Sequence, residues 1–194
     1  MKKEDGTLTK RCNQHWQLLR SEYVYQCPWL SLRKDVVLTT KGIEIPDFYV
    51  LEYPIWVNVI AKTVEGKYLL ERQYRHGIQQ CVYELCAGMC DPGEQPIDAA
   101  KRELLEETGY SGGSWSLVGK YAPNPSAMTN CSYTFLAEGV VKRKSPCPEN
   151  TEDIQVFEVT EEELLKVMQG GEMIEGVMLA PLWQYFYNNK QANH

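Results

Sequence analysis

The chain has 194 residues and a formal net charge of −6 at pH 7, which suits one compact domain with a small appendage. The negative balance argues against a nucleic-acid partner, because binding to phosphates requires a basic face. The sequence shows neither a secretory signal nor an apolar run that approaches a membrane span, so we expect no membrane partner and a cytoplasmic location.

The N-terminal segment, residues 1–53, is predicted to be a small strand-rich unit. β-like stretches at 23–26, 30–40 and 47–53 are separated by turn-forming residues. Residues 54–194 are then expected to form the main domain.

The first part of the main domain is predicted to be a hairpin, a strand and a helix. Residues 56–63 and 67–74 read as a hairpin around residues 64–66, and residues 82–86 read as a further strand. A loop rich in turn-forming residues follows at 88–94. The helix body spans 97–108, with Pro96 at its first position and Gly109 as its stop.

Three more strands are expected at 115–121, 131–137 and 154–159. Thr160 and Glu163 form a capping-box pattern that begins a short helix, which ends near Gly170. A last amphipathic helix covers about 177–188, with Pro181 near its first turn. Strands that alternate with two or three helices predict an α/β fold in which helices cover one mixed β-sheet in α/β/α layers.

The helix at 97–108 carries a group of acidic residues. At about 100° per residue, Glu103 and Glu107 lie about 40° apart on one face, and Glu106 reaches the same end of that face. Three carboxylates repel one another, and acids near the end of a helix oppose its dipole. From the helix alone two interpretations stay open: a solvated acidic face, which these effects disfavour, and a site for a hard divalent cation such as Mg²⁺, which would compensate the charge.

The spacing of the surrounding residues is regular. Gly88 is followed by five residues, Glu94, seven residues and then RELLEETGY at 102–110. This resembles the Nudix box, G-x5-E-x7-R-E-U-x-E-E-x-G-U with U apolar or aromatic, and every specified position is filled. Arg102 can hold Glu94 and so fix how the loop meets the helix. The resemblance implies a Nudix hydrolase, with a Nudix α/β/α sandwich after the small N-terminal β-strand unit.

The resemblance also implies the roles of the site residues. Glu103 and Glu107 match acids that bind Mg²⁺ or Mn²⁺, with Glu106 as a further ligand and the Ala87 carbonyl as a backbone ligand. Gly88 lets the backbone come close to the metal and the diphosphate. The cations activate a water that attacks one phosphorus, and they stabilise the charge on the leaving phosphate.

Residues outside the box resemble the ADP-ribose pyrophosphatases within the family. The run YELCAGMCDPGE at 83–94 resembles their E-L-P-A-G-x-x-D-x-G-E, with Cys86 in place of the proline, and Pro125 lies 16 residues after Gly109. The tripeptide at 73–75 resembles their Q-[FY]-R, whose arginine contacts phosphates. The alternative for Arg75 is a surface salt bridge.

The expected reaction is hydrolysis of ADP-ribose to AMP and ribose 5-phosphate. Another nucleoside diphosphate sugar, such as GDP-mannose or UDP-glucose, remains an alternative substrate. A domain that binds ADP-ribose without cleaving it and regulates another protein is a further alternative, although such domains tend to lose box acids that this chain keeps.

The general base in similar enzymes comes from a loop before the penultimate strand, here residues 148–153. Glu152 aligns best and Glu149 second, but acidic loops are usually just solvated. Trp16, Trp29 and Trp56 are candidates to stack on a nucleobase, with a place in the core or at an interface as the alternative.

In similar enzymes the N-terminal strands exchange between two subunits. The segment before Tyr53 is long enough to do so and too small to fold alone, so we expect a homodimer. Cys81, Cys86 and Cys90 lack the spacing of a structural zinc site and are expected to be buried free cysteines.

Overall fold

The structure is a computed structural model that describes residues 15–148, 151 and 153–192. The chain divides into two units, one made of residues 1–53 with 126–129 and the other of residues 54–125 with 130–194. The two units are described one after the other. No helix of the described residues is long and apolar enough to cross a membrane.

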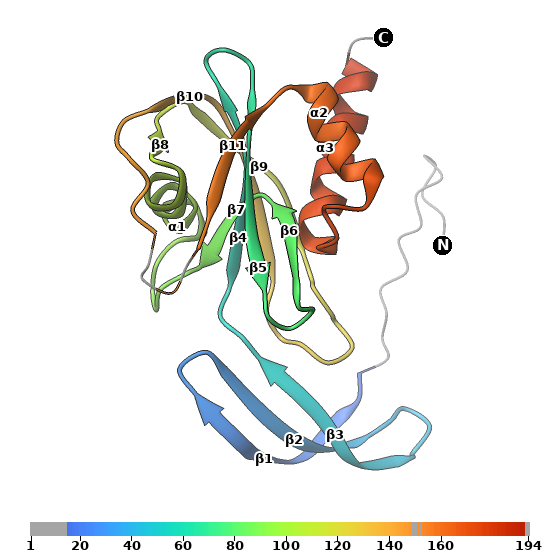
Figure 1. The fold of residues 1–194 in the computed structure, drawn as a ribbon. Helices are drawn as coiled ribbons and strands as arrows, with labels where there is room; N and C mark the ends of the chain where they lie inside the picture. The colour runs from blue at the N-terminus through green and yellow to red at the C-terminus, as the bar shows by residue number, and fades with distance from the viewer. Residues whose placement is uncertain (1–14, 149–150, 152, 193–194) are drawn as a thin grey trace. The chain divides into compact units, whose positions relative to one another are not determined.

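The N-terminal unit is a three-stranded antiparallel sheet (Figure 1). Its strands are β1 (Gln17–Cys27), β2 (Leu30–Leu38) and β3 (Glu44–Glu52), which lie in the order β1-β2-β3. The segment 126–129 extends this unit, because Leu51 donates its N–H to the Ala127 carbonyl at 2.7 Å and accepts from Thr129 N at 3.1 Å. The small β-strand unit predicted from the sequence is therefore found.

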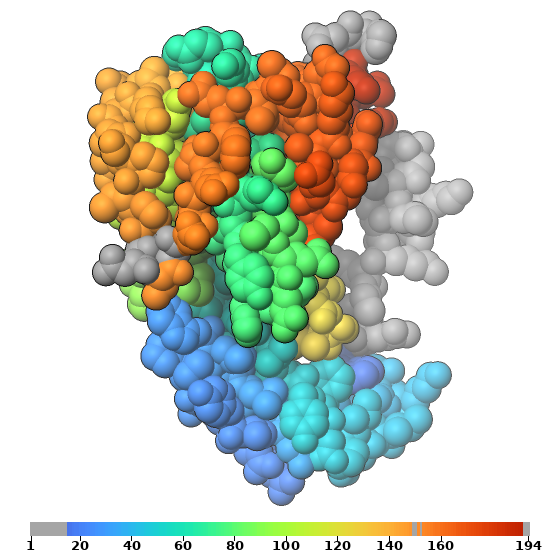
Figure 2. Space-filling model, in the orientation of Figure 1, coloured from blue at the N-terminus to red at the C-terminus, as the bar shows by residue number. Residues whose placement is uncertain are grey.

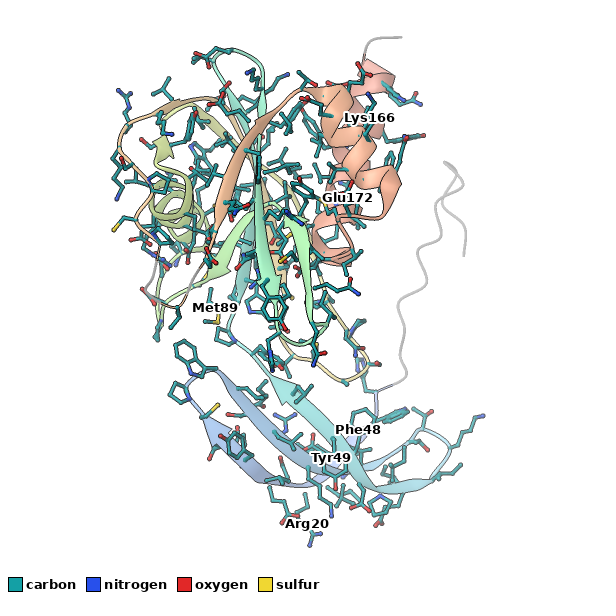
Figure 3. The ribbon with its side chains drawn as sticks, viewed as in Figure 1. Arg20, Phe48, Tyr49, Met89, Lys166 and Glu172 are labelled. Atoms are coloured by element: carbon teal, nitrogen blue, oxygen red, sulfur yellow. The ribbon has the colours of Figure 1, made fainter. Side chains whose placement is uncertain are left out.

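Polar contacts hold the middle of this sheet. Asp35 is buried and accepts hydrogen bonds from Ser21 Oγ at 2.7 Å and from Arg33 Nε at 3.0 Å. Phe48 and Tyr49 are neighbours on β3 and therefore point to opposite faces (Figure 3). Many large apolar side chains of this unit are exposed: Trp16, Leu18, Leu19, Tyr23, Val24, Tyr25, Trp29, Ile43 and Tyr49.

The main unit is built on an eight-stranded sheet. The central order is β11-β5-β4-β10-β8, with β6 beside β5, β7 beside β4 and β9 beside β10. The pair β4–β10 is parallel and the other pairs are antiparallel, so the sheet is mixed. The strands are β4 (Trp56–Thr63), β5 (Tyr68–Arg75), β6 (Gln80–Glu84), β7 (Cys86–Met89), β8 (Tyr110–Ser111), β9 (Ser114–Tyr121), β10 (Ser132–Lys142) and β11 (Gln155–Val159).

Helices cover both faces of this sheet (Figure 1). The helix α1 (Pro96–Glu103) lies on one face, and α2 (Glu161–Gly170) and α3 (Gly176–Ala192) lie on the other. Alternate residues of β4 supply both cores, with Val57 and Val59 in the core beside α1 and Ile60 in the core beside α2 and α3. The predicted α/β/α sandwich is confirmed.

The local signals at the helix ends are also confirmed. Pro96 begins α1, and Gly109 ends the helical segment in the left-handed conformation with φ of 77°. Thr160 and Glu163 form the capping box of α2, which ends at Gly170. One side of the helical segment packs on the core, since Ala100, Leu104 and Thr108 are fully buried and Ile97 packs against the core.

The strand predicted at 82–86 is wrong in its extent. The chain forms two short strands there, because β6 pairs with β5 while β7 pairs with β4. Leu85 lies between them and is buried in the core beside α3. Gly88 consequently lies within β7 rather than in the loop that was expected to begin at that residue.

The helix predicted at 97–108 is not α-helical throughout. It is α-helical to Glu103 and continues as a π-helix over Leu104–Thr108. A π turn widens the backbone spiral, so the spacing of about 100° per residue does not describe Glu106 and Glu107. Such turns occur often at functional sites.

Pro181 lies at the sixth position of α3, just after its first turn. Proline has no N–H, so it cannot donate to the Val177 carbonyl four residues before it. Asn58 on β4 supplies the missing donor. Its Nδ2 donates to the Val177 carbonyl at 2.9 Å and also to Ser132 Oγ at 2.9 Å. The buried Asn58 side chain thus joins the sheet to the first turn of α3.

Candidate active site

Gly88 on β7 leaves space for the side chain of Glu103. A Cβ atom at position 88 would lie 2.0 Å from Glu103 Oε1 and 2.1 Å from Glu103 Cδ. These distances are far inside van der Waals contact, and the atoms met lie at the flexible end of the Glu103 side chain. A side chain at position 88 would therefore displace the Glu103 carboxylate, and glycine allows this carboxylate to rest against the strand.

Arg102 connects the loop to the helix. It donates to Glu94 twice, from Nε at 3.1 Å and from Nη2 at 3.0 Å. Its Nη1 donates to Glu103 at 2.9 Å and to Glu106 at 3.3 Å, and Nη2 also donates to the Met89 carbonyl at 3.0 Å. The pairing with Glu94 expected from the sequence is present, and this hydrogen bond lowers the pKa of the Glu94 carboxyl.

Glu107 belongs to a buried cluster. Ligand atoms of Glu71, Cys86 and Glu107 lie within 4.8 Å of one another, and all three side chains are buried. Glu107 Oε2 accepts a hydrogen bond from Ala87 N at 3.1 Å. Burial raises the pKa of the Cys86 thiol, and the charges of Glu107 and Glu71 raise it further. Buried carboxylates held so close repel one another, and either a bound proton or a bound cation relieves that repulsion.

The sequence analysis gave no role to Glu71 or to Glu84, although Glu84 belongs to the run at 83–94. They lie opposite each other on β5 and β6, and both are almost completely buried. A signal exists in the sequence: Glu71 shares a strand face with Leu69, which packs against α1. A carboxylate on the core-facing side of a strand usually has a specific partner or a function.

Arg75 is fixed by Glu84. Its Nε donates to Glu84 Oε1 at 2.7 Å and its Nη2 to Glu84 Oε2 at 2.6 Å, while Gln73 Nε2 donates to the same carboxylate at 3.0 Å. Burial lowers the pKa of Arg75, but the hydrogen bond to Glu84 and the charges of Glu84, Glu175 and Glu107 raise it overall. The protonated guanidinium thus lies within electrostatic reach of the Glu107 cluster, and its partner is buried, so the pair is not an ordinary surface salt bridge.

The other predicted site residues lie in different places. Glu106 is the most exposed of the three helix acids, and its backbone carbonyl accepts from Cys147 N at 2.7 Å. Trp56 begins β4 opposite Met89 of β7, near the box loop (Figure 3). Trp29 is in the turn between β1 and β2 of the other unit and is 63% exposed.

The predicted general base, Glu152, and its alternative, Glu149, lie outside the described residues. Of the three clustered cysteines, Cys86 and Cys90 are buried as expected. Cys81 is exposed, so the expectation that all three are buried was wrong, because position 81 falls near the exposed start of β6.

Carboxylates gathered around a glycine-bearing strand, next to a protonated arginine, suit cation-assisted chemistry on phosphates. The fold and the site fit the class of metal-dependent phosphohydrolases. Comparison with known proteins gives the family: the chain belongs to the NUDIX family. Residues 53–175 match the NUDIX domain, and residues 16–51 match the nucleoside diphosphate sugar hydrolase N-terminal domain.

Individual proteins resemble most of the chain. An ADP-ribose pyrophosphatase of Bacillus subtilis is 31% identical over 149 residues, which cover 73% of this chain and 80% of that protein. A methanol dehydrogenase activator of Bacillus methanolicus is 29% identical over 152 residues, which cover 78% and 82%. The crystal structure of an ADP compounds hydrolase has a TM-score of 0.80 at 18% identity and covers 94% of this chain and 98% of its own, which shows the shared fold.

Proposed function

We propose that the chain hydrolyses the diphosphate linkage of a nucleoside diphosphate sugar with the help of a divalent cation. ADP-ribose, cleaved to AMP and ribose 5-phosphate, is the main substrate. The observation that carries the proposal is the contact of Glu103 with Gly88, which brings the box carboxylates to the strand. The match of residues 16–51 to the N-terminal domain of nucleoside diphosphate sugar hydrolases and the similarity to an ADP-ribose pyrophosphatase support the substrate class.

The donor set fits Mg²⁺ or Mn²⁺. Glu103, Glu106 and Glu107 with the Ala87 carbonyl offer hard oxygen donors, which both ions prefer. The space kept open at Gly88 supports this assignment, since a side chain there would displace Glu103. Such a cation supplies Lewis-acid chemistry at the phosphates.

Arg75 and Arg102 have different roles in this proposal. The Arg75 side chain extends from the β5–β6 strand pair and is 44% exposed. Its guanidinium binds phosphate oxygens of the diphosphate. Arg102 stays bonded to Glu94, Glu103 and Glu106 and keeps the loop and the helix acids in place. It acts through these residues, so it is a positioning residue.

Glu152 is proposed to accept the proton of the attacking water, with Glu149 as the second choice. Both residues belong to the acidic segment before β11. Replacing each by glutamine separately tests the assignment: loss of kcat in Glu152→Gln alone supports it, and loss in Glu149→Gln alone transfers the role.

Two alternative functions remain to be compared with ADP-ribose hydrolysis. Another nucleoside diphosphate sugar, such as GDP-mannose or UDP-glucose, would replace ADP-ribose without a change in chemistry. A regulator that binds ADP-ribose without cleaving it has one observation in its favour, the similarity to a methanol dehydrogenase activator. The complete set of box acids favours hydrolysis.

We further propose that the protein is a cytoplasmic homodimer in which the N-terminal unit exchanges between subunits and Trp29 contributes to the partner's substrate site. The long run of exposed apolar residues on β1 supports an interface there. Sedimentation at micromolar concentration tests this: a monomer that hydrolyses substrate efficiently would contradict it. We propose no nucleic-acid or membrane partner.

The substrate assignment is tested with a panel of nucleoside diphosphate sugars and nucleoside triphosphates, with Mg²⁺ and Mn²⁺ compared. The highest kcat/KM is expected for ADP-ribose. A clear preference for a nucleoside triphosphate would contradict the substrate class, and binding without turnover would favour the regulator.

A further inference from the structure

Two of the three side chains in the buried cluster around Glu107 have no role in the function proposed above. Ligand atoms of Glu71, Cys86 and Glu107 lie within 4.8 Å of one another. The three residues are 0%, 1% and 2% exposed. Glu71 and Cys86 belong neither to the Nudix box, which begins at Gly88, nor to the oxygen donors assigned to Mg²⁺ or Mn²⁺.

The alternation of side chains along the strands brings this cluster to the face of the sheet that α1 covers. Leu69 on β5 and Cys86 on β7 both belong to the core beside α1. Glu71, two residues after Leu69, therefore points to the same face, as does position 88, where Glu103 rests against the strand. The cluster and the box acids consequently share one face of the sheet.

The position of Glu71 is fixed by strands on both sides. It is paired with Val156 of β11 and with Glu84 of β6. Figure 2 shows the orange residues of β11 beside the green residues of β5 and β6. The two oxygens of Glu84 accept hydrogen bonds from Arg75 and Gln73. Glu71, and not Glu84, is therefore the carboxylate of this strand pair that joins the cluster.

The π-helical segment at Leu104–Thr108 separates Glu107 from Glu106. The Glu106 side chain is 44% exposed, whereas Glu107 is buried. Glu107 Oε2 accepts a hydrogen bond from Ala87 N at 3.1 Å, which holds its carboxylate beside the strand that carries Cys86. The three ligand atoms thus come from β5, β7 and the helical segment, so no spacing along the sequence could show them together.

Two carboxylates and one thiol form a different donor set from the oxygen donors of the box. Mg²⁺ prefers oxygen ligands, whereas a thiolate selects softer cations such as Zn²⁺. Bonds of about 2.0 to 2.3 Å to such an ion place two of its tetrahedral ligands about 3.3 to 3.8 Å apart. Atoms that already lie within 4.8 Å of one another need only a small shift to share one ion.

The number of protein ligands also matters for when the cation binds. Mg²⁺ is usually held by one or two carboxylates and completes its shell with waters and substrate phosphates. Three side chains brought together by the fold bind a cation without substrate, and the fourth position remains for a water. The Cys86 thiol gives up its proton to the solvent when it coordinates.

We propose that Glu71, Cys86 and Glu107 form an inner site for one divalent cation of the Zn²⁺ class, which is bound before substrate. Cys86, which replaces the proline of the run at 83–94, supplies the thiolate. The site goes beyond the donor set of the proposed function, and its occupancy is measured without substrate.

Titration of the metal-free, reduced full-length protein with Co²⁺, a spectroscopic substitute for Zn²⁺, tests the inner site. One equivalent of Co²⁺ is expected to produce a thiolate-to-metal charge-transfer absorption in the ultraviolet, and excess Mg²⁺ is expected to leave it in place. The absorption should be lost in Cys86→Ser. Cys90→Ser is the matched control, because Cys90 is a buried thiol of the same core outside the cluster, and it is expected to keep the absorption.

Glu71→Gln tests the site through a second strand. It keeps the thiol and the shape of the side chain, so the absorption remains, but Zn²⁺ and Co²⁺ are expected to bind at least about tenfold more weakly, since even residues that only orient a ligand are worth that much. Calorimetric titration measures the affinity. Glu65→Gln, exposed in the turn between β4 and β5, is the control, and thermal unfolding shows whether each variant is folded.

Three outcomes would overturn the inference: no charge-transfer absorption in the wild-type protein, an absorption that persists in Cys86→Ser, and equal affinity for Zn²⁺ in Glu71→Gln and Glu65→Gln. Displacement of Co²⁺ by Mg²⁺ would also contradict it, because the ion would then occupy the oxygen donors of the box. A protein that binds Co²⁺ through Cys86 but hydrolyses no nucleoside diphosphate sugar would refute the proposed function and leave the inner site standing.

Discussion

Glu84 holds Arg75 with two hydrogen bonds of 2.7 and 2.6 Å, and the two partners differ strongly in exposure. The Glu84 side chain is 1% exposed and that of Arg75 is 44% exposed. The buried carboxylate therefore anchors a guanidinium whose outer side remains accessible. Because Arg75 also interacts electrostatically with Glu107, its guanidinium is a positive group held by Glu84 within reach of the acid cluster.

Glu84→Gln tests this anchoring. The substitution removes the charge and leaves an amide with only one acceptor atom for the guanidinium. We expect KM for ADP-ribose to rise about tenfold and the free energy of unfolding to fall by about 2 kcal/mol, the usual worth of a hydrogen bond to a charged group. Glu138→Gln, on an exposed position of β10, is the control. Wild-type KM and stability in Glu84→Gln would show that Arg75 is positioned by other contacts.

Gly88→Ala tests the close approach of the strand to the helix. The added methyl group would occupy the position of the Glu103 carboxylate, so that carboxylate has to move. We expect kcat to fall at least about a hundredfold, since misplacement of a catalytic group by about 1 Å costs that much, while circular dichroism remains native. Gly77→Ala is a matched control, because a Cβ at position 77 meets no atom within 4 Å. Equal activity of the two variants would contradict the role of Gly88.

Glu107→Gln tests the proposed cation site. The side chain keeps its shape but loses one charge from a buried cluster. We expect kcat to fall at least about a thousandfold, because Lewis-acid stabilisation is worth several kcal/mol. Glu161→Gln on the exposed first turn of α2 serves as the control. Near-normal turnover of Glu107→Gln at saturating Mg²⁺ would remove Glu107 from the site.

The cysteines are expected to differ in reactivity. Burial, assisted by the charge of Glu94, raises the pKa of Cys90 to about 11, and burial raises the pKa of Cys86 as well. A raised pKa keeps a thiol protonated, and the thiolate is the reactive form. At pH 8 we expect iodoacetamide to modify the exposed Cys81 and Cys147 and to spare Cys86 and Cys90 until urea unfolds the chain. Mass spectrometry of peptides measures this, and rapid labelling of Cys90 in the folded protein would contradict its burial.

The parts of the fold that could be predicted from the sequence depend on local signals. Pro96 fits the first position of a helix, Gly109 supplies the left-handed residue at its end, and the capping box marks the start of α2. These residues act through their own backbone or through neighbours three or four positions away. The order of these local signals along the chain was therefore sufficient to predict the α/β/α arrangement.

The missed features depend on residues far apart in the sequence. The break at Leu85 arises because β6 and β7 pair with different strands, and periodicity cannot show a change of partner. Glu71 could not be placed beside Glu107 from the sequence, because it lies outside the box and the two residues come together only through the sheet, where Glu84 pairs with Glu71. Glu175 likewise interacts electrostatically with Arg75 only in the folded unit.

Product analysis of ADP-ribose in ¹⁸O-labelled water tests the central claim most directly. With Mg²⁺ or Mn²⁺ present, we expect AMP and ribose 5-phosphate as the only products, with one ¹⁸O atom in one of the two phosphates, and no reaction after chelation of the cation. Unchanged ADP-ribose beside rapid hydrolysis of a nucleoside triphosphate, or cleavage that persists without a divalent cation, would contradict the account.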